Sequence, residues 1–193
     1  MQNYQLVLAS TSPFRQQLLK KLGLPFVTAS PQCDETAHQG ESPQALVTRL
    51  AEEKARSCTI DQASLVIGSD QVCVINGEIV GKPHTKEQAI AQLLKQSDKA
   101  ITFYTGIALY NSCSNTCLVD IDTFTVHFRN LSLKMATAYV EKEQPLQCAG
   151  SFMSEGLGIA LFERLEGDDP NTLVGLPLIK LVKLLESQGV NIL

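Results

Sequence analysis

Short runs of hydrophobic residues alternate with amphipathic segments along the whole chain of 193 residues. Apolar β-branched runs predict buried strands, and apolar residues that recur every three to four positions predict helices. The expected strands cover residues 5–9, 26–29, 65–67, 78–80, 100–111, 118–129 and 159–162, and the expected helices cover about 13–22, 43–56, 85–97, 133–142 and 178–188. Strands that alternate with helices in this way are typical of an α/β fold.

The first helix places a cation where a hydrophobic residue is expected. Ser12 suits the N-cap and Pro13 the first helical position. In helical projection Arg15 falls at about 60°, inside the stripe that Leu18, Leu22 and Leu19 set at about 0°, 40° and 100°. The helix dipole also disfavours a cation in the first turn. A bound anion would offset both penalties; the alternative is an arginine whose stem lies along apolar surface while its head reaches water.

The second helix has the same arrangement, with Ser42 as its expected N-cap. Lys54 falls at about 80°, between Leu50 at about 40° and Val47 at about 100°, whereas Arg49 lies on the opposite, charged face. A lysine in such a stripe must reach water, lose its proton or meet an anion. Inward cations on two helices therefore indicate a buried anionic ligand.

The segment from Leu65 to Pro83 is expected to carry the chemistry. A buried strand is predicted to end near Asp70, and Gly68 leaves room for a ligand or another backbone to approach. Asn76-Gly77 predicts a two-residue hairpin turn. The returning strand would bring Lys82 near Asp70, so that an acid and an ammonium border one pocket. The alternative is that Asp70 caps a turn and Lys82 is solvated.

Composition and charge limit the classes of function. A net charge of −4 argues against a protein that coats nucleic acid or anionic membranes. No apolar run approaches the ~20 residues needed to span a bilayer, and the first residues lack the pattern of a signal peptide. The six cysteines form no C-x-x-C pair and the three histidines are scattered. We therefore expect a cytoplasmic protein that binds neither membranes nor nucleic acid.

Five short motifs, taken in order, resemble the Maf family of nucleoside triphosphate pyrophosphatases over essentially the whole chain. They are STSPFR (10–15), DET (34–36), EKA (53–55), GSDQV (68–72) and GKP (81–83). The later segments FYTG (103–106), AGSF (149–152), SEG (154–156), FERLEG (162–167) and DPNTLVGLP (169–177) resemble the branch that hydrolyses 7-methyl-GTP.

The resemblance implies an elongated α/β fold of the inosine-triphosphatase-like kind, with a mixed sheet, flanking helices and a central active-site cleft. Residues 1–193 would form a single Maf-like domain with two lobes around that cleft. The family also implies a divalent metal cation, Mg²⁺ or Mn²⁺, and release of pyrophosphate and a nucleoside monophosphate. The oligomeric state, a monomer or a homodimer, is left open.

Roles for individual residues follow from the matched motifs. Phosphates would be bound by Ser10, Arg15, Lys54 and Lys82. Glu35 and Asp70 would hold the metal and activate water; Asp70 is the expected proton acceptor, with Glu35 as the alternative, and Gln71 stands beside it.

Two further residues are expected to select the base. Many family members have an arginine before the matched Arg15, and this chain has Phe14. An aromatic face attracts the positively charged 7-methylguanine ring by ~1–2 kcal/mol when desolvated. Glu155 would accept hydrogen bonds from the guanine edge. The alternatives are a core phenylalanine and a loop carboxylate without a ligand.

The expected reaction is hydrolysis of 7-methyl-GTP to 7-methyl-GMP and pyrophosphate, which would remove a modified nucleotide from the pool. One alternative keeps the enzyme and changes the base to UTP, TTP or a modified purine. Another, from a different class, is a nucleotide-binding regulator of cell division, because members of this family are also described as septum-formation inhibitors. It predicts binding with negligible turnover.

Overall fold

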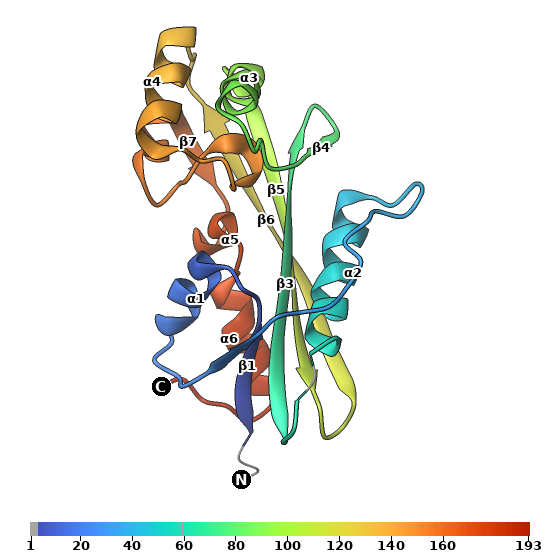
Figure 1. Ribbon diagram of the computed structural model, residues 1–193. Helices are drawn as coiled ribbons and strands as arrows, with labels where there is room; N and C mark the ends of the chain where they lie inside the picture. Colours follow the sequence, from blue (N-terminus) through green and yellow to red (C-terminus); the bar gives the residue numbers. More distant parts are fainter. Residues whose placement is uncertain (1–3, 59) are drawn as a thin grey trace. The chain divides into compact units, whose positions relative to one another are not determined.

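The computed structural model describes residues 4–58 and 60–193 (Figure 1). The strands are β1 (Gln5–Ala9), β2 (Val27–Ala29), β3 (Ser64–Ile75), β4 (Glu78–Val80), β5 (Ala100–Asn111), β6 (Thr116–Phe128) and β7 (Phe162–Glu166). The helices are α1 (Pro13–Lys20), α2 (Pro43–Arg56), α3 (Lys86–Gln96), α4 (Leu133–Glu143), α5 (Asn171–Val174) and α6 (Leu178–Ser187), and η1 (Ala149–Ser151) and η2 (Leu157–Leu161) are short 3₁₀ helices.

The strands are hydrogen-bonded in the order β2-β1-β3-β5-β6-β7, and β4 pairs with β3. Strand β1 is parallel to β2 and β3, whereas β3–β4 and β6–β7 are antiparallel. A mixed sheet with helices between its strands confirms the α/β class. The chain divides into two compact units: unit 1 comprises the described residues within 1–71, 105–122 and 175–193, and unit 2 comprises 72–104 and 123–174.

Unit 1 is built on strand β1, which is almost completely buried between its two parallel neighbours. Strands covered on both faces need continuous hydrophobic runs, and this explains the sequence of β1 and the start of β3. Helices α1 and α2 begin as expected, because Ser12 Oγ accepts from Arg15 N at 3.4 Å and Ser42 Oγ accepts from Ala45 N at 3.2 Å.

Two glycines let helix α2 lie directly against the strands of unit 1. A Cβ at Gly68 on β3 would overlap the carbonyl of Ala51, and one at Gly106 on β5 would overlap the carbonyl of Val47. Ala55 borders Gly68 as well. The close approach predicted for Gly68 is therefore made by the backbone of a helix.

The structure corrects the expected end of the central strand. Strand β3 runs without interruption to Ile75, so Asp70 lies within the strand and not where it ends. The hairpin is confirmed: Asn76 and Gly77 have φ of 52° and 84°, and Cys73 on β3 pairs with Val80 on β4. Two positive φ angles are what a type I′ turn requires, which is why Asn-Gly is found there.

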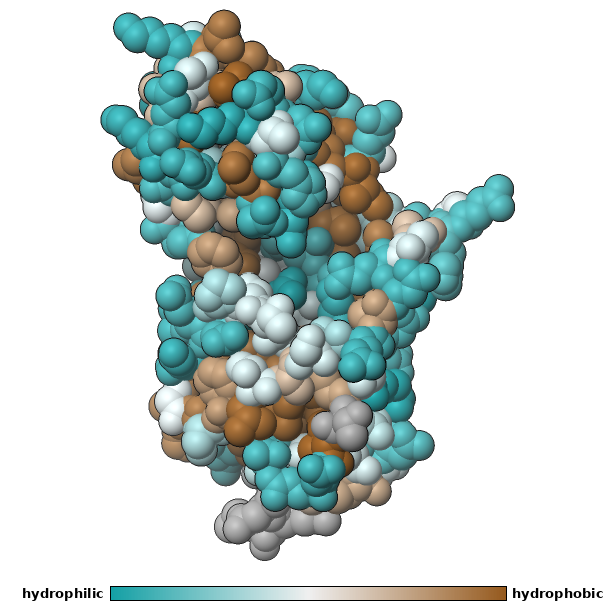
Figure 2. Space-filling model, in the orientation of Figure 1, coloured by the Kyte–Doolittle hydropathy of each residue, from teal (hydrophilic) through white to brown (hydrophobic). Residues whose placement is uncertain are grey.

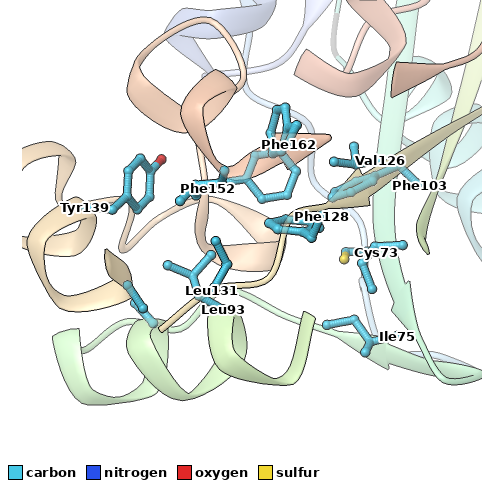
Figure 3. Close-up of a cluster of buried hydrophobic side chains, with 14 of the residues drawn as sticks. Cys73, Ile75, Leu93, Phe103, Val126, Phe128, Leu131, Tyr139, Phe152 and Phe162 are labelled. Carbon is cyan, nitrogen blue, oxygen red and sulfur yellow. The ribbon is translucent and has the colours of Figure 1, made fainter. Parts of the chain in front are cut away.

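Unit 2 has its own hydrophobic core, which is rich in phenylalanine (Figure 3). The ring of Phe152 contacts those of Phe103, Phe128 and Phe162 edge-on, with centroids 5.0–5.5 Å apart. Edge-to-face packing of this kind stabilises a core beyond the area that it buries. Phe152 therefore fixes the segment that leads into the loop at residues 153–156.

The strand expected at 159–162 is wrong: this stretch is mostly the helix η2, and the strand β7 begins only at Phe162. The glycine that precedes this stretch explains the difference, because a Cβ at Gly158 would overlap the carbonyl of Met153, so the chain is folded tightly there. Among the helices formed by the described residues, none combines the length and hydrophobicity needed to cross a membrane.

Candidate active site

An ion cluster in unit 1 joins residues from three parts of the chain. Lys54 Nζ donates to Asp70 Oδ1 at 2.7 Å and lies 2.7 Å from Glu35 Oε1. The side chains of Lys54 and Asp70 are buried, with 7% and 11% of their surface exposed, whereas 66% of Glu35 is exposed. Asp70 and Lys54 thus form the fixed part of the cluster, and Glu35 covers it from a loop.

The close packing of α2 explains how Lys54 reaches Asp70. Ala51, about one turn before Lys54, and Ala55, directly after it, pack against the strands, and Gly68 lies two residues before Asp70 on β3. The inward position predicted for Lys54 is confirmed. Its neutralising partners, however, are two carboxylates of the chain itself, so its burial alone does not require an anionic ligand.

Arg15 is the second cation near this cluster. It is partly buried, and its Nε donates to the carbonyl oxygen of Gly175 at 2.8 Å. Burial lowers the pKa of its guanidinium, and the nearby carboxylates of Asp70 and Glu35 oppose that shift. The structure therefore brings Arg15, Lys54, Asp70 and Glu35 into one electrostatic neighbourhood, with two cations facing two carboxylates.

Neighbouring polar groups hold the strands of this site together. Ser69 Oγ lies 2.8 Å from the carbonyl of Gly106 and 2.9 Å from that of Gly175. Gln71 Nε2 donates to Thr105 Oγ1 at 3.0 Å. Both contacts fix β3 next to Asp70, which limits the freedom of its carboxylate.

Ser10 is placed at the start of α1. It is buried, and its Oγ accepts from Ser12 N at 3.1 Å. The hydroxyl therefore faces the backbone N–H groups that precede α1, where helices commonly bind anions. Phe14, on the first turn of α1, is partly exposed and is not part of the buried core. The alternative of a core phenylalanine is wrong.

Hydrogen bonds from Arg49 hold the loop that carries Glu35. Arg49 donates to Glu41 Oε1 at 2.7 Å, to Glu41 Oε2 at 2.8 Å and to the carbonyl of Thr36 at 3.1 Å. The hydrogen bonds from Arg49 lower the pKa of Glu41 to about 2. Figure 2 shows this loop as a hydrophilic projection at the right, ahead of α2. A partly buried charge pair thus holds the chain at Thr36, directly after Glu35.

Lys82 and Glu155 belong to unit 2. Burial is the main cause that raises the pKa of the Cys148 thiol to about 11; Glu155 adds to the shift and Lys82 opposes it. Both side chains therefore lie within electrostatic range of Cys148. The return of Lys82 toward Asp70 stays a prediction, because the two residues belong to different units.

Glu35 and Asp70 are the side chains that the resemblance assigns to a divalent metal. Among residues 4–58 and 60–193, no three histidine, cysteine or acidic side chains are grouped so that they could hold a metal ion. Oxygens of Glu35 and Asp70 nevertheless converge on one point, which Lys54 Nζ fills. Mg²⁺ is commonly bound by one or two carboxylates with water and substrate phosphates. These two residues fit that kind of site.

The sequence did not reveal the groups that support the site through their backbone or hydroxyl. The carbonyl of Gly175 contacts both Arg15 and Ser69, and Thr105 contacts Gln71. Gly175 and Thr105 lie within segments that carried the resemblance, but a carbonyl leaves no residue-type signal. Only the fold shows that the turn before α6 lies against α1.

Comparison with known proteins identifies the class. A family model described as "Maf-like protein" matches residues 5–188. Proteins named 7-methyl-GTP pyrophosphatase are 69% identical in Vibrio cholerae, over the full length of both chains, and 57% identical in Aliivibrio fischeri, over 98% of each. The chain belongs to the Maf family.

A solved structure gives the fold relationship. The Ham1 protein of Staphylococcus aureus has a TM-score of 0.50 at 15% identity, over 95% of this chain and 99% of that one. At this identity the similarity concerns the fold alone, and it agrees with the α/β fold expected from the sequence.

Proposed function

We propose that the protein hydrolyses 7-methyl-GTP between its α- and β-phosphates and releases 7-methyl-GMP and pyrophosphate. Membership of the Maf family and the names of relatives 57–69% identical over nearly the whole chain support the reaction and the substrate. The observation that carries the proposal is the buried Lys54–Asp70 pair, with Glu35 and Arg15 close by. A cytoplasmic location stays a prediction, and the choice between a monomer and a homodimer stays open.

Asp70 is the proposed proton acceptor. Its Oδ1 is fixed by Lys54, so Oδ2 would take the proton of a water that attacks the α-phosphorus. A carboxylate held in one orientation contributes more to such a step than a mobile one. Glu35 is more exposed and lies on a loop, and for this reason we assign it to metal binding rather than to proton transfer.

A divalent cation held by Glu35 and Asp70 would polarise the phosphoryl oxygens. Lys54, which keeps its contact with Asp70, and Arg15 would stabilise charge on the departing pyrophosphate. Ser10 at the start of α1 would orient a phosphate through its hydroxyl. Lys82 remains a predicted phosphate ligand.

Selection of the base is assigned to Phe14, Gln71 and Glu155. Phe14, at the start of α1, is only partly buried. A cationic 7-methylguanine ring gains more from an aromatic face and a carboxylate than neutral guanine does. This difference favours the methylated nucleotide over GTP, UTP and TTP.

The test is a panel of nucleotides incubated with Mg²⁺ or Mn²⁺ and with the products identified. We expect 7-methyl-GTP to be the best substrate and to yield pyrophosphate and 7-methyl-GMP. Orthophosphate as the product would overturn the cleavage position, and faster hydrolysis of UTP or TTP would overturn the substrate. Tight nucleotide binding without turnover would identify a regulator instead of an enzyme.

A further inference from the structure

Glu143 in unit 2 is a charged side chain whose position the fold alone does not explain. It is the last residue of helix α4, and its Oε2 is shielded from solvent without a hydrogen-bond partner among the described residues. A carboxylate at a helix C-terminus is opposed by the helix dipole. A shielded, unpaired oxygen of this kind costs further free energy.

The carboxylate of Glu143 lies directly against the loop that carries Glu155. Any Cβ at Gly156 would overlap Glu143 Oε2, so the glycine permits the contact. The segment before it is fixed to the same helix, because Met153 N donates to Tyr139 Oη at 2.9 Å. Helix α4 therefore supplies both an anchor for the loop and a second carboxylate beside it.

Both carboxylates and Lys82 lie within electrostatic range of the Cys148 thiol. Burial is the largest cause that raises the pKa of the Cys148 thiol. Glu155 and Glu143 raise this pKa further, and Lys82 lowers it. Burial also raises the pKa of Tyr139, and Glu143 and Glu155 add to that shift. Glu143 and the loop of Glu155 are thus neighbours by geometry, and among the ion pairs of the described residues none involves Glu143, Glu155 or Lys82.

We propose that Glu143 is a further specificity residue, which binds the positively charged base of the nucleotide together with Glu155. The inference rests on the proposed function and assigns a second contact to the same substrate. A 7-methylguanine ring carries a full positive charge next to N–H donors. Such a ligand would neutralise the carboxylate that the free protein leaves unpaired, whereas the neutral base of GTP would not.

The test compares Glu143→Gln, which keeps size and removes charge, with the wild type on 7-methyl-GTP and GTP. We expect kcat/KM for 7-methyl-GTP to fall about tenfold, mainly through KM, with GTP changed less than twofold. The melting temperature of the variant should be unchanged or higher, because a shielded charge at a helix C-terminus is removed. Glu141→Gln, an exposed change on the same helix, is the matched control and should leave both substrates unaffected.

Equal losses on both substrates, or no loss on either, would overturn the role of Glu143. A second measurement separates this outcome from failure of the proposed function. If the wild type does not hydrolyse 7-methyl-GTP, calorimetry with 7-methyl-GMP and GMP still measures preference for the cationic base. Loss of that preference in Glu143→Gln would support the inference alone, and an unchanged preference would refute it.

Discussion

The two units differ in whether a charge shielded from solvent has a partner. In unit 1, Lys54 is buried but meets two carboxylate oxygens at 2.7 Å, and Asp70 is held by that contact. In unit 2, Glu143 Oε2 is shielded and has no partner among the described residues. The first arrangement is complete before any ligand binds, as a catalytic group that must be oriented requires. The second is completed only by a cation, which suits selection of a substrate.

The largest effect on stability is expected when the Lys54–Asp70 ion pair is broken. Lys54→Met leaves Asp70 buried without its partner, so we expect the free energy of unfolding to fall by about 3 kcal/mol, with loss of activity. Urea denaturation measures the change. Lys180→Met is the control, because its pair with Asp120 is partly exposed and should cost less than about 1 kcal/mol. Equal costs for the two variants would show that the Lys54–Asp70 pair has no special role in unit 1.

A smaller effect is expected at the aromatic position. Phe14→Arg should remove a cation–π contribution of about 1–2 kcal/mol, which is about a five- to thirtyfold loss of preference for 7-methyl-GTP over GTP. Parallel kinetics on the two substrates measure the ratio. An unchanged ratio would show that the ring of Phe14 does not contact the base, and selection would then depend on the carboxylates of unit 2.

The smallest effect concerns the loop that carries Glu35. Arg49 holds the pKa of Glu41 at about 2, below its ordinary value of 4.5, so the ionised pair stabilises the folded state above pH 4.5. That stabilisation is lost as the pH falls from 4.5 toward 2. Glu41→Gln should therefore be less stable than the wild type at pH 7, and the difference should shrink across this range in denaturation curves. A difference that is constant with pH would contradict the role of this pair.

The sequence predicted the individual helices, strands and turns better than the contacts between them. Helix starts at Ser12 and Ser42 and the Asn76-Gly77 turn depend on local chemistry, and all are confirmed. The continuation of β3 through Asp70 depends on pairing with distant strands, so a window of neighbouring residues could not reveal it. The run at 159–162 looked like a strand because its residues are hydrophobic, but the tight fold at Gly158 makes most of it the helix η2.

The candidate site was predictable only in part. Helical projection placed Lys54 and Arg15 inward, but it could not tell which anion they meet. The answer lies in Glu35 and Asp70, which are distant in sequence and reach Lys54 because glycines let α2 approach β3. Glu143 was missed, because a glutamate at a helix end looks like an ordinary surface residue until the loop at Gly156 covers it.

We propose that Asp70 performs the chemistry while Glu155 selects the base. The most direct test is the ratio of kcat/KM for 7-methyl-GTP to that for GTP in Asp70→Asn and Glu155→Gln. We predict that Asp70→Asn lowers turnover at least about 100-fold on both substrates and keeps the ratio, whereas Glu155→Gln lowers the ratio about tenfold. Near-normal turnover in Asp70→Asn, or a ratio that changes there and not in Glu155→Gln, would contradict this account.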